Sequence, residues 1–309
     1  MKRKVIALLV LTSLALASAP DFALAVEKKK PVAVKKHGHK AKHRRIAEEA
    51  ASVDGRRLAV QSSAALVQDQ ESGEILFAKK ADAIVPIASI SKLMTAMVVL
   101  DSEPDLSEML SIGEEDVDTV KGTHSRLKVG TRLSREEMLS LALMSSENRA
   151  AAALSRHYPG GRSVFVAAMN RKTRELGLTE TRFEDPTGLT AANVSSARDL
   201  AKMVMAAHDY PLIREFTTTG ERQFIISGRA LTFRNTNSLV RSSSWDIGLS
   251  KTGYINEAGK CLVMQASVNN KPTIIVLLDS WGRQTRIGDA NRIKRSLESA
   301  ALRQKPKAG

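Results

Sequence analysis

Three short motifs in the sequence bring together residue types that can perform nucleophilic chemistry. In chain order they are Ser89-Ile90-Ser91-Lys92, Ser146-Glu147-Asn148 and Lys251-Thr252-Gly253. A serine hydroxyl is a weak nucleophile at neutral pH and needs an adjacent base. The first motif therefore predicts Ser89 as a nucleophile, with Lys92 as the base that takes its proton.

The position of Ser89 distinguishes it from a second serine with the same spacing. Ser125-Arg126-Leu127-Lys128 also fits S-x-x-K, a pattern that average residue usage produces about once in a chain this long. Ser89 and Lys92 open an apolar stretch with helical spacing, so both side chains lie on one face at the positive end of a helix. Ser125 lies between glycines in an expected loop, where we expect its lysine to be solvated.

Lys92 can accept a proton only if its pKa is depressed. Partial burial and the nearby cation Lys251 would both lower it. On an ordinary surface helix Lys92 would stay protonated and Ser89 would be inert. The presence of the two later motifs argues against that interpretation.

The other two motifs supply groups that can bind a substrate and move protons. Ser146 and Asn148 fall in a short break between expected helices, where they can relay a proton to a leaving amine and hold a peptide backbone. Taken singly, they would be ordinary helix caps. Lys251 and Thr252, at the end of an expected strand, can present a cation and a hydroxyl to a carboxylate, and Gly253 lets a ligand backbone approach closely.

Alternative catalytic chemistries lack support in the sequence. There is no G-x-S-x-G elbow, and we interpret three histidines in the folded region, His124, His157 and His208, as structural because no triad motif surrounds them. No H-E-x-x-H or paired-cysteine motif supports zinc, so no cofactor or metal is expected. The single cysteine, Cys261, is expected to be a small buried hydrophobic residue.

The elements that must position these residues follow the order strands, helices, strands, helix. Because both ends of the folded region contribute strands, we expect them to share one antiparallel sheet. Ser134 is expected to open a helix with a capping box, Ser163 to cap a helix ending near Gly177, and Ser196 to open one ending before Pro211. Strands are expected at 64–68, 74–78, 224–226, 245–253, 259–268 and 273–278, and helices at 89–100, 134–144, 149–157, 163–175, 196–210 and 284–302.

Motifs of these three kinds in this order are the signature of penicillin-binding proteins and class A β-lactamases. The chain resembles the low-molecular-mass penicillin-binding proteins, and most closely their D-alanyl-D-alanine endopeptidase branch. The resemblance spans about residues 60 to 300, with matching segments at 88–95, 142–151, 185–189 and 251–259. It implies an α+β fold of the β-lactamase and transpeptidase type: a five-stranded antiparallel sheet flanked by helices, plus a helical subdomain.

The resemblance also implies a role for each motif residue. Ser89 would form the acyl-enzyme, with Lys92 as its base and with Ser146 and Asn148 assisting. Lys251 and Thr252 would recognise the substrate carboxylate. The oxyanion hole would use the backbone N–H groups of Ser89 and Tyr254, so the side chain of Tyr254 is not required.

The implied activity is that of a periplasmic serine DD-endopeptidase that hydrolyses D-alanyl to meso-diaminopimelyl crosslinks in peptidoglycan and is acylated by β-lactam antibiotics. A D-alanyl-D-alanine carboxypeptidase is the alternative, and a β-lactamase or a non-catalytic peptidoglycan-binding protein ranks lower.

The sequence departs from the family pattern in two respects. The middle motif reads S-E-N in place of S-D-N, and the second domain and C-terminal anchor of many carboxypeptidase relatives are not expected, because about 27 residues follow Gly282. No E-x-x-x-N motif after Asn148 supports the β-lactamase interpretation.

The ends of the chain have a different character from its centre. Residues 1–25 have the layout of a cleaved secretory signal, with Lys2, Arg3 and Lys4 before an apolar run; that run is shorter than the ~20 residues of a membrane span. Residues 26–57 form a basic linker that cannot order itself. It is expected either to contact anionic lipid or peptidoglycan carboxylates weakly or only to solubilise the chain. It has no aromatic residue for stacking on nucleic acid. The catalytic domain is expected at 58–303 and a flexible tail at 304–309.

Overall fold

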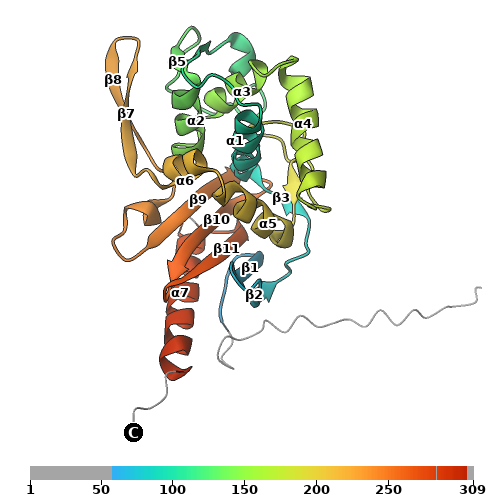
Figure 1. The fold of residues 1–309 in the computed structure, drawn as a ribbon, viewed down its shortest axis with the longest axis vertical. Helices are drawn as coiled ribbons and strands as arrows, with labels where there is room; N and C mark the ends of the chain where they lie inside the picture. Colours follow the sequence, from blue (N-terminus) through green and yellow to red (C-terminus); the bar gives the residue numbers. More distant parts are fainter. Residues whose placement is uncertain (1–57, 283, 305–309) are drawn as a thin grey trace, which may run out of the picture. The chain divides into compact units, whose positions relative to one another are not determined.

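The folded part of the protein is built on a five-stranded antiparallel sheet with the strand order β2-β1-β11-β10-β9 (Figure 1). The computed structural model describes residues 58–282 and 284–304. Two strands come from the start of this region and three from its end, which confirms the expected shared sheet. The strands are β1 (Ala64–Asp69), β2 (Ile75–Lys79), β9 (Asp246–Ile255), β10 (Gly259–Val268) and β11 (Lys271–Ser280). The expected signal peptide, the basic linker and residues 305–309 lie outside the described residues.

The sheet separates two hydrophobic clusters, as the alternation of side chains along β11 shows. Ile274, Val276 and Leu278 belong to one cluster, and Ile275 and Leu277 belong to the other. Helices α5 (Ala197–His208) and α6 (Pro211–Thr218) pack on the first face, and α7 (Thr285–Gln304) packs on the second. The sheet is therefore covered on both faces, as expected.

Strands β10 and β11 are joined by a two-residue turn at the expected position. Asn269 and Asn270 have φ angles of +55° and +60°, which matches the turn type that suits the right-handed twist of paired strands. Asparagine tolerates this conformation better than most residues. The turn fixes the register in which Val268 pairs with Lys271.

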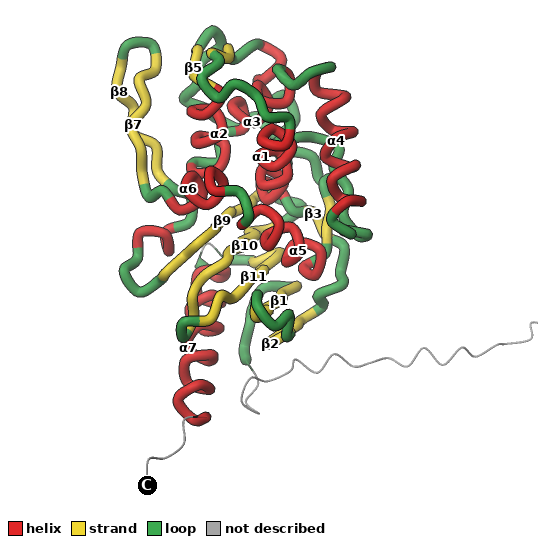
Figure 2. The backbone as a smooth tube through the Cα atoms, in the orientation of Figure 1, coloured by secondary structure: helices red, strands yellow, loops and turns green. Residues whose placement is uncertain are grey.

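A helical region lies beyond one end of the sheet (Figure 2). Its central helix, α1 (Ser91–Asp101), packs against α2 (Arg135–Met144), α3 (Asn148–Arg156) and α4 (Gly161–Glu175). Every α1 residue from Ser91 to Val99 is buried. A helix surrounded in this way needs apolar residues all round, and Lys92 is its only charged residue before Asp101. The buried lysine of the first motif is therefore exceptional within its own helix.

Helix caps follow the sequence at two of the three expected positions. Ser134 accepts a hydrogen bond from Glu137 N and completes the expected capping box, and Ser196 accepts one from Asp199 N. The expected cap at Ser163 is wrong. Helix α4 starts at Gly161, because Gly160 and Gly161 have φ angles of +83° and +74° and turn the chain into the helix two residues earlier.

Helix α6 has no counterpart among the elements expected from the sequence. The sequence pattern predicts only that the preceding helix ends before Pro211, but Pro211 also occupies the first turn of α6. Proline is well suited to the first helical position, because a backbone N–H there would have no hydrogen-bond partner within the helix. None of the helices in the described residues is long and apolar enough to cross a membrane.

The remaining elements are short. They form three two-stranded pairs and three single 3₁₀ turns around the sheet and the helical region. The pairs are β3 (Val85–Pro86) with β6 (Val194–Ser195), β4 (Met109–Ser111) with β5 (Arg132–Ser134), and β7 (Glu221–Ile226) with β8 (Arg229–Arg234); the turns are η1 (Ala88–Ile90), η2 (Glu114–Asp116) and η3 (Ser238–Arg241).

Candidate active site

Ser89 lies in η1, the turn that leads directly into α1. The residue before it, Ala88, has a φ of +50°, in a region that residues with a Cβ rarely adopt. Strain of this kind persists only where the surrounding structure holds it. Ala88 is fully buried whereas Ser89 is half-buried, so the turn presents the hydroxyl at the edge of the core.

Lys92 is fully buried and contacts groups from three parts of the chain. Its Nζ lies 2.9 Å from Ser89 Oγ, 2.7 Å from Asn148 Oδ1 and 2.6 Å from the carbonyl oxygen of Thr187. An ammonium group donates to all three. A neutral amine has only two N–H donors and one lone pair. It can donate to Asn148 and Thr187, which accept only, and its lone pair then accepts the Ser89 hydroxyl proton. The arrangement is that of a nucleophile and its base.

Burial lowers the pKa of Lys92 to about 7, and the negative charges of Asp185 and Glu147 limit the decrease. The sequence predicted this direction from partial burial and from the cation Lys251. In the structure, burial is complete and accounts for the lowered pKa of Lys92, whereas burial and the repulsion between the two lysines lower the pKa of Lys251. The pKa of Lys251 is also lowered well below its ordinary value, first by burial and then by repulsion from Lys92 and Arg286.

A second lysine and serine lie opposite the first pair. Lys251 Nζ donates to Ser146 Oγ at 2.9 Å and to Thr252 O at 3.0 Å. Because the Ser146 oxygen accepts from Lys251, its own proton remains available for donation into the site. Ser146 has a φ of +62° and lies in the expected break between α2 and α3, so it is not a helix cap. Thr252 Oγ1 lies 2.6 Å from Thr236 Oγ1.

Gly253 has a different neighbour from the one expected. The sequence predicted close approach by a ligand backbone. A Cβ at this position would instead lie 2.7 Å from Ile87 O and 3.3 Å from Ser89 N. The absence of a side chain therefore lets β9 pack against the turn that carries Ser89. The Tyr254 side chain is 54% exposed, and its hydroxyl donates to Asn256 Oδ1.

The turn at residues 185–190 contacts Lys92 of the candidate site, although none of its residues was predicted to take part in the chemistry. The Asp185 carboxylate accepts hydrogen bonds from Thr187 N, Gly188 N and Thr190 N and from the Thr187 hydroxyl. This network orients the Thr187 carbonyl oxygen toward Lys92. The segment was part of the resemblance, but a backbone carbonyl carries no signal of its own in the sequence. No sequence motif indicated the contact of Thr236 with Thr252 either.

The second S-x-x-K serine is not paired with its lysine. Ser125 Oγ donates to Glu147 Oε2 at 2.7 Å and accepts from Leu127 N, while Lys128 is exposed. Ser125 lies in the expected loop, and this loop contacts the S-E-N motif again where Asn148 Nδ2 donates to Thr123 Oγ1. Glu147 therefore attaches the loop to the site. Ser267, the serine of a second S-x-N, lies in β10 as expected.

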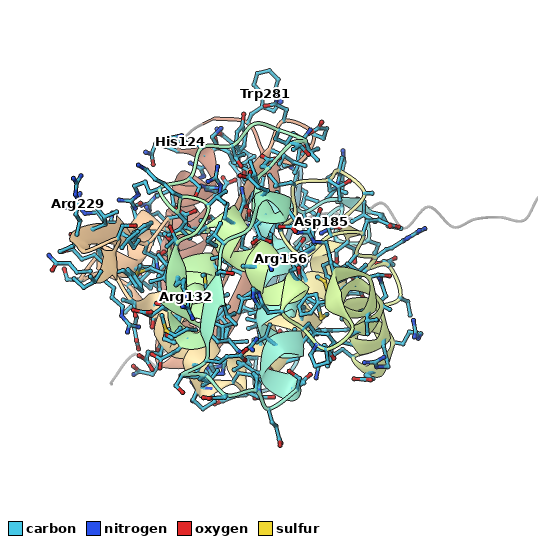
Figure 3. All side chains as sticks on the ribbon, turned by 90° about the horizontal axis from the view of Figure 1, so that it is seen from above. His124, Arg132, Arg156, Asp185, Arg229 and Trp281 are labelled. Carbon is cyan, nitrogen blue, oxygen red and sulfur yellow. The ribbon has the colours of Figure 1, made fainter. Side chains whose placement is uncertain are left out.

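None of the three histidines in the described region forms a hydrogen bond with Ser89. His124 is exposed (Figure 3), His157 Nδ1 contacts Ala153 O, and burial lowers the pKa of His208. Cys261 is buried and free, and burial raises the pKa of its thiol to about 11. Among residues 58–282 and 284–304, no group of histidine, cysteine and acidic side chains could hold a metal ion.

Comparison with known proteins places this geometry in context. The family model for D-alanyl-D-alanine carboxypeptidase matches residues 47–282. The chain is 49% identical over 249 residues to a D-alanyl-D-alanine endopeptidase of Pseudomonas aeruginosa, covering 80% of each protein. It is 44% identical over 265 residues to that of Escherichia coli, covering 85% of this chain and 86% of the relative. The structure matches that of the Streptomyces K15 DD-transpeptidase with a TM-score of 0.72 and 28% identity, over 78% of this chain and 98% of that one.

Proposed function

The chain belongs to the D-alanyl-D-alanine carboxypeptidase family of serine peptidases, and we propose that it is a DD-endopeptidase that cuts D-alanyl to meso-diaminopimelyl crosslinks in peptidoglycan. The observation that carries this proposal is the contact of Lys92, with a pKa of about 7, with Ser89 Oγ at 2.9 Å. The two relatives described above are named D-alanyl-D-alanine endopeptidases, which supports endopeptidase over carboxypeptidase action. Carboxypeptidase action on pentapeptide stems is the alternative.

In the first step Ser89 attacks the carbonyl carbon of the D-alanyl residue. Neutral Lys92 takes the hydroxyl proton as the bond from Oγ to carbon forms. The negative charge moves to the carbonyl oxygen, where we assign the backbone N–H groups of Ser89 and Tyr254 as its donors. Donation from Lys92 to Asn148 and Thr187 holds the amine in place during the transfer.

In the second step the carbon–nitrogen bond breaks and the leaving amine takes a proton. We assign this delivery to Ser146, whose hydroxyl is supported by Lys251. The proton that Lys92 took from Ser89 then replaces the one that Ser146 gave up, so Lys92 is neutral again before deacylation. The amine leaves with the acceptor stem, and Ser89 remains esterified to the donor stem. Water then attacks the ester with Lys92 as base, which releases the acid and restores the Ser89 hydroxyl. Thr252, with Lys251, is assigned to the carboxylate beside the scissile bond.

The site of action follows from this substrate. Peptidoglycan lies outside the inner membrane, and the signal-like residues 1–25 support export to the periplasm, where the enzyme would remodel the cell wall. The strained acyl group of a β-lactam would react with Ser89 in the same way. We expect its ester to persist, because the sequence has no E-x-x-x-N motif after Asn148 of the kind that supports rapid deacylation of penicillin in a β-lactamase.

Digestion of purified crosslinked dimers and of pentapeptide monomers tests the assignment. We expect the wild-type chain to convert dimers to monomers, and Ser89→Ala to leave them intact. Release of terminal D-alanine alone, with dimers uncut, would show a carboxypeptidase. Rapid repeated turnover of penicillin would show a β-lactamase, and unchanged activity in cells carrying Ser89→Ala would favour a non-catalytic binding role.

A further inference from the structure

The turn that carries Ser89 is held from below by a buried serine. Ser91, the third residue of the S-x-x-K motif, is fully buried. Its hydroxyl donates to Ala88 O at 2.8 Å, and its backbone N–H donates to the same oxygen. Ala88 is the residue with a φ of +50°. Both lone pairs of its carbonyl oxygen are therefore used by Ser91.

The Ser91 hydroxyl in turn accepts a hydrogen bond from the side chain of Asn193. Asn193 is also fully buried, and its Nδ2 atom lies 2.9 Å from Ser91 Oγ. Its Oδ1 atom accepts from Glu184 N at 2.7 Å and from Asp185 N at 3.1 Å, and Nδ2 also donates to Asp185 O at 2.8 Å. The side chain therefore makes all four hydrogen bonds of which an amide is capable.

The backbone fixes the direction of these hydrogen bonds. The N–H groups of Glu184 and Asp185 can only donate, so the side-chain oxygen of Asn193 must face them. The amide nitrogen then faces Ser91, whose oxygen accepts from it and whose proton goes to Ala88 O. Reversal of either bond would place two donors or two acceptors against each other. The hydrogen-bond chain from Asn193 to Ala88 therefore has a single direction.

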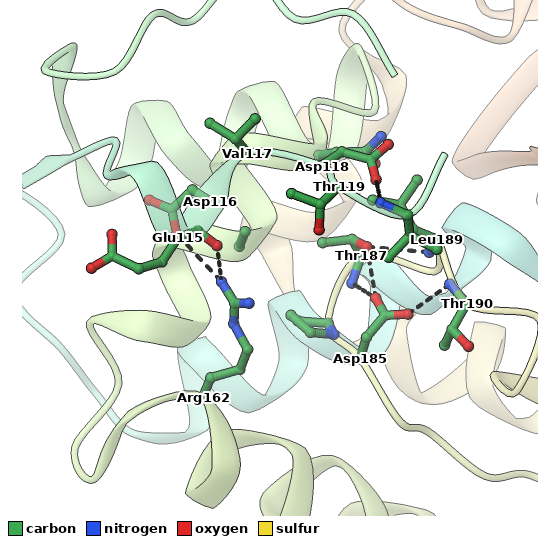
Figure 4. A pocket seen from close by; sticks show the side chains of 14 residues that line it. Glu115, Asp116, Val117, Asp118, Thr119, Arg162, Asp185, Thr187, Leu189 and Thr190 are labelled. Atoms are coloured by element: carbon green, nitrogen blue, oxygen red, sulfur yellow. Dashed lines mark hydrogen bonds and ion pairs between the residues drawn. The ribbon is translucent and has the colours of Figure 1, made fainter. Parts of the chain in front are cut away.

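The turn that precedes Asn193 is braced by its own hydrogen bonds. Figure 4 shows the Asp185 carboxylate bound to Thr187 and Thr190 in this turn. Asn193 is also bound through its backbone to the segment that leads into η1, since Ile87 N donates to Asn193 O at 3.1 Å. Asn193 therefore connects a braced turn to the start of η1.

The Ala88 carbonyl belongs to the same peptide unit as the Ser89 N–H. In a trans peptide unit the C=O and the N–H point in opposite directions. The hydrogen bonds that hold Ala88 O against Ser91 therefore turn the Ser89 N–H to the other side. This N–H donates to no group among the described residues, so it remains available to a ligand.

We propose that Asn193 and Ser91 are positioning residues for the oxyanion hole. The inference rests on the proposed acylation of Ser89, in which this N–H stabilises the negative charge on the carbonyl oxygen. Such a donor is effective because it already points at the position that the charged oxygen will occupy. Asn193 acts through Ser91, and Ser91 acts through the Ala88 carbonyl. Because both side chains are fully buried, they set the direction of the donor without contact with the substrate.

The rate of acylation by labelled penicillin, measured at several penicillin concentrations, tests this role. Ser91→Ala removes the hydroxyl and should lower the maximal rate about tenfold, less than the loss of a whole oxyanion donor. The concentration that gives half of the maximal rate should stay the same, because the oxyanion forms only during the reaction. Ser91→Thr keeps a hydroxyl and should restore the rate. Rates are compared on the plateau above about pH 8, where Lys92, with its pKa of about 7, is neutral.

Ser155→Ala is the matched control for the loss of a buried hydroxyl. Ser155 is fully buried in α3, and its hydroxyl donates at 2.7 Å to Ala152 O, the carbonyl three residues earlier, as Ser91 does with Ala88. Both alanine variants lose a hydrogen bond of this kind, but only Ser91→Ala should slow acylation. Urea unfolding confirms that each variant is folded in the assay. Equal slowing in both variants would contradict a specific role of Ser91.

Asn193→Asp tests the first member of the hydrogen-bond chain. The carboxylate keeps acceptors for Glu184 N and Asp185 N but has no N–H, so the Ser91 hydroxyl donates to it and leaves Ala88 O. The plateau rate should again fall about tenfold. The double variant with Ser91→Ala should fall no further, because both substitutions remove the same hydrogen bond. A loss of about a hundredfold in the double variant would show that Asn193 does not act through Ser91.

Two results would overturn the positioning role of Ser91: a wild-type plateau rate in Ser91→Ala, or a loss in Ser91→Thr as large as that in Ser91→Ala. A different result concerns the premise. If the wild-type chain is not labelled at Ser89, the proposed function is contradicted, and the positioning role falls with it.

Discussion

At the scale of single residues, the chemistry depends on a lysine that is costly to bury. Lys92 has no carboxylate among its three hydrogen-bond partners, which are a hydroxyl, an amide and a backbone carbonyl. A paired carboxylate would stabilise the ammonium form and raise the pKa. The neutral partners let burial dominate, so the amine can be a base near neutral pH.

Acylation should therefore depend on pH in a defined direction. The reactive form is neutral Lys92, whose fraction rises as pH increases through the pKa of about 7. The rate of acylation by labelled penicillin should rise about tenfold per unit at low pH and level off above about pH 8. The measurement is a stopped-flow rate across this range. A constant rate from about pH 5.5 to 8.5 would show that Lys92 does not titrate as the base.

The motifs predicted side chains that the structure brings together, but not the groups that support them. Each predicted residue from Ser89 to Thr252 carries a side-chain group with a known chemical use, so its type and spacing were informative. Thr187 acts through its carbonyl oxygen, which every residue possesses. Thr236 contacts Thr252 because the chain between them folds through η3 and β9. No local sequence pattern indicates such a contact.

At the scale of elements, two turns meet beside Ser89. Gly188, with a φ of +82°, lies so close to η1 that a Cβ would be 2.0 Å from Ala88 O and 2.8 Å from Ser89 N. The turn at 185–190 thus supports both the backbone before Ser89 and, through Thr187, the amine of Lys92. Glycine is required here both for its conformation and for its lack of volume.

Gly188→Ala should lower the free energy of unfolding much more than a Gly→Ala substitution at another position with a similar φ angle. Gly130 has a similar φ of +84°, but a Cβ added there would meet nothing within 4 Å, so Gly130→Ala should cost about 1 kcal/mol for conformation alone. Gly188→Ala should cost about 3 kcal/mol or more, because it adds a clash with backbone. Urea unfolding measures both. Equal losses, with normal acylation in Gly188→Ala, would contradict the role given to this contact.

The elements that the sequence predicted best are those with a local signal. The turn at Asn269 and Asn270 and the caps at Ser134 and Ser196 each require particular residue types. The start of α4 and the existence of α6 were missed because Gly160 and Pro211 are compatible with more than one local structure. Tertiary packing decided between those structures.

At the scale of the whole folded region, the segment that precedes β1 is hydrogen-bonded to α7, the last helix of the chain. The buried Asp289 carboxylate of α7 accepts from Gln61 N, Ser62 N and the Ser62 hydroxyl, and Arg292 also contacts it. This network joins residues more than 200 positions apart. The sequence predicted the shared sheet from the order of its elements, but this network had no signal.

Asp289→Asn should destabilise the protein in a pH-dependent way. Burial raises the pKa of Asp289, but the hydrogen bonds from Gln61 and Ser62 outweigh it and lower the pKa below its ordinary value of 3.8. The ionised carboxylate therefore contributes its full stabilisation above about pH 4, and this is lost as pH falls through the folded pKa. The substitution should cost about 2 kcal/mol at neutral pH.

Denaturant unfolding at several pH values measures this contribution, with Asp246→Asn as the control because Asp246 is exposed on β9. The difference between wild type and Asp289→Asn should shrink below about pH 4. A difference that stays constant into acid would show that the charge of Asp289 does not stabilise the fold.

The proposed mechanism depends on which serine is acylated, and covalent labelling identifies that serine. The full chain is incubated with labelled penicillin, and the modified peptide is identified by mass spectrometry. We predict one label, on Ser89, that is abolished in Ser89→Ala and retained in Ser125→Ala. Label on Ser125, or label that survives in Ser89→Ala, would show that Ser89 is not the nucleophile.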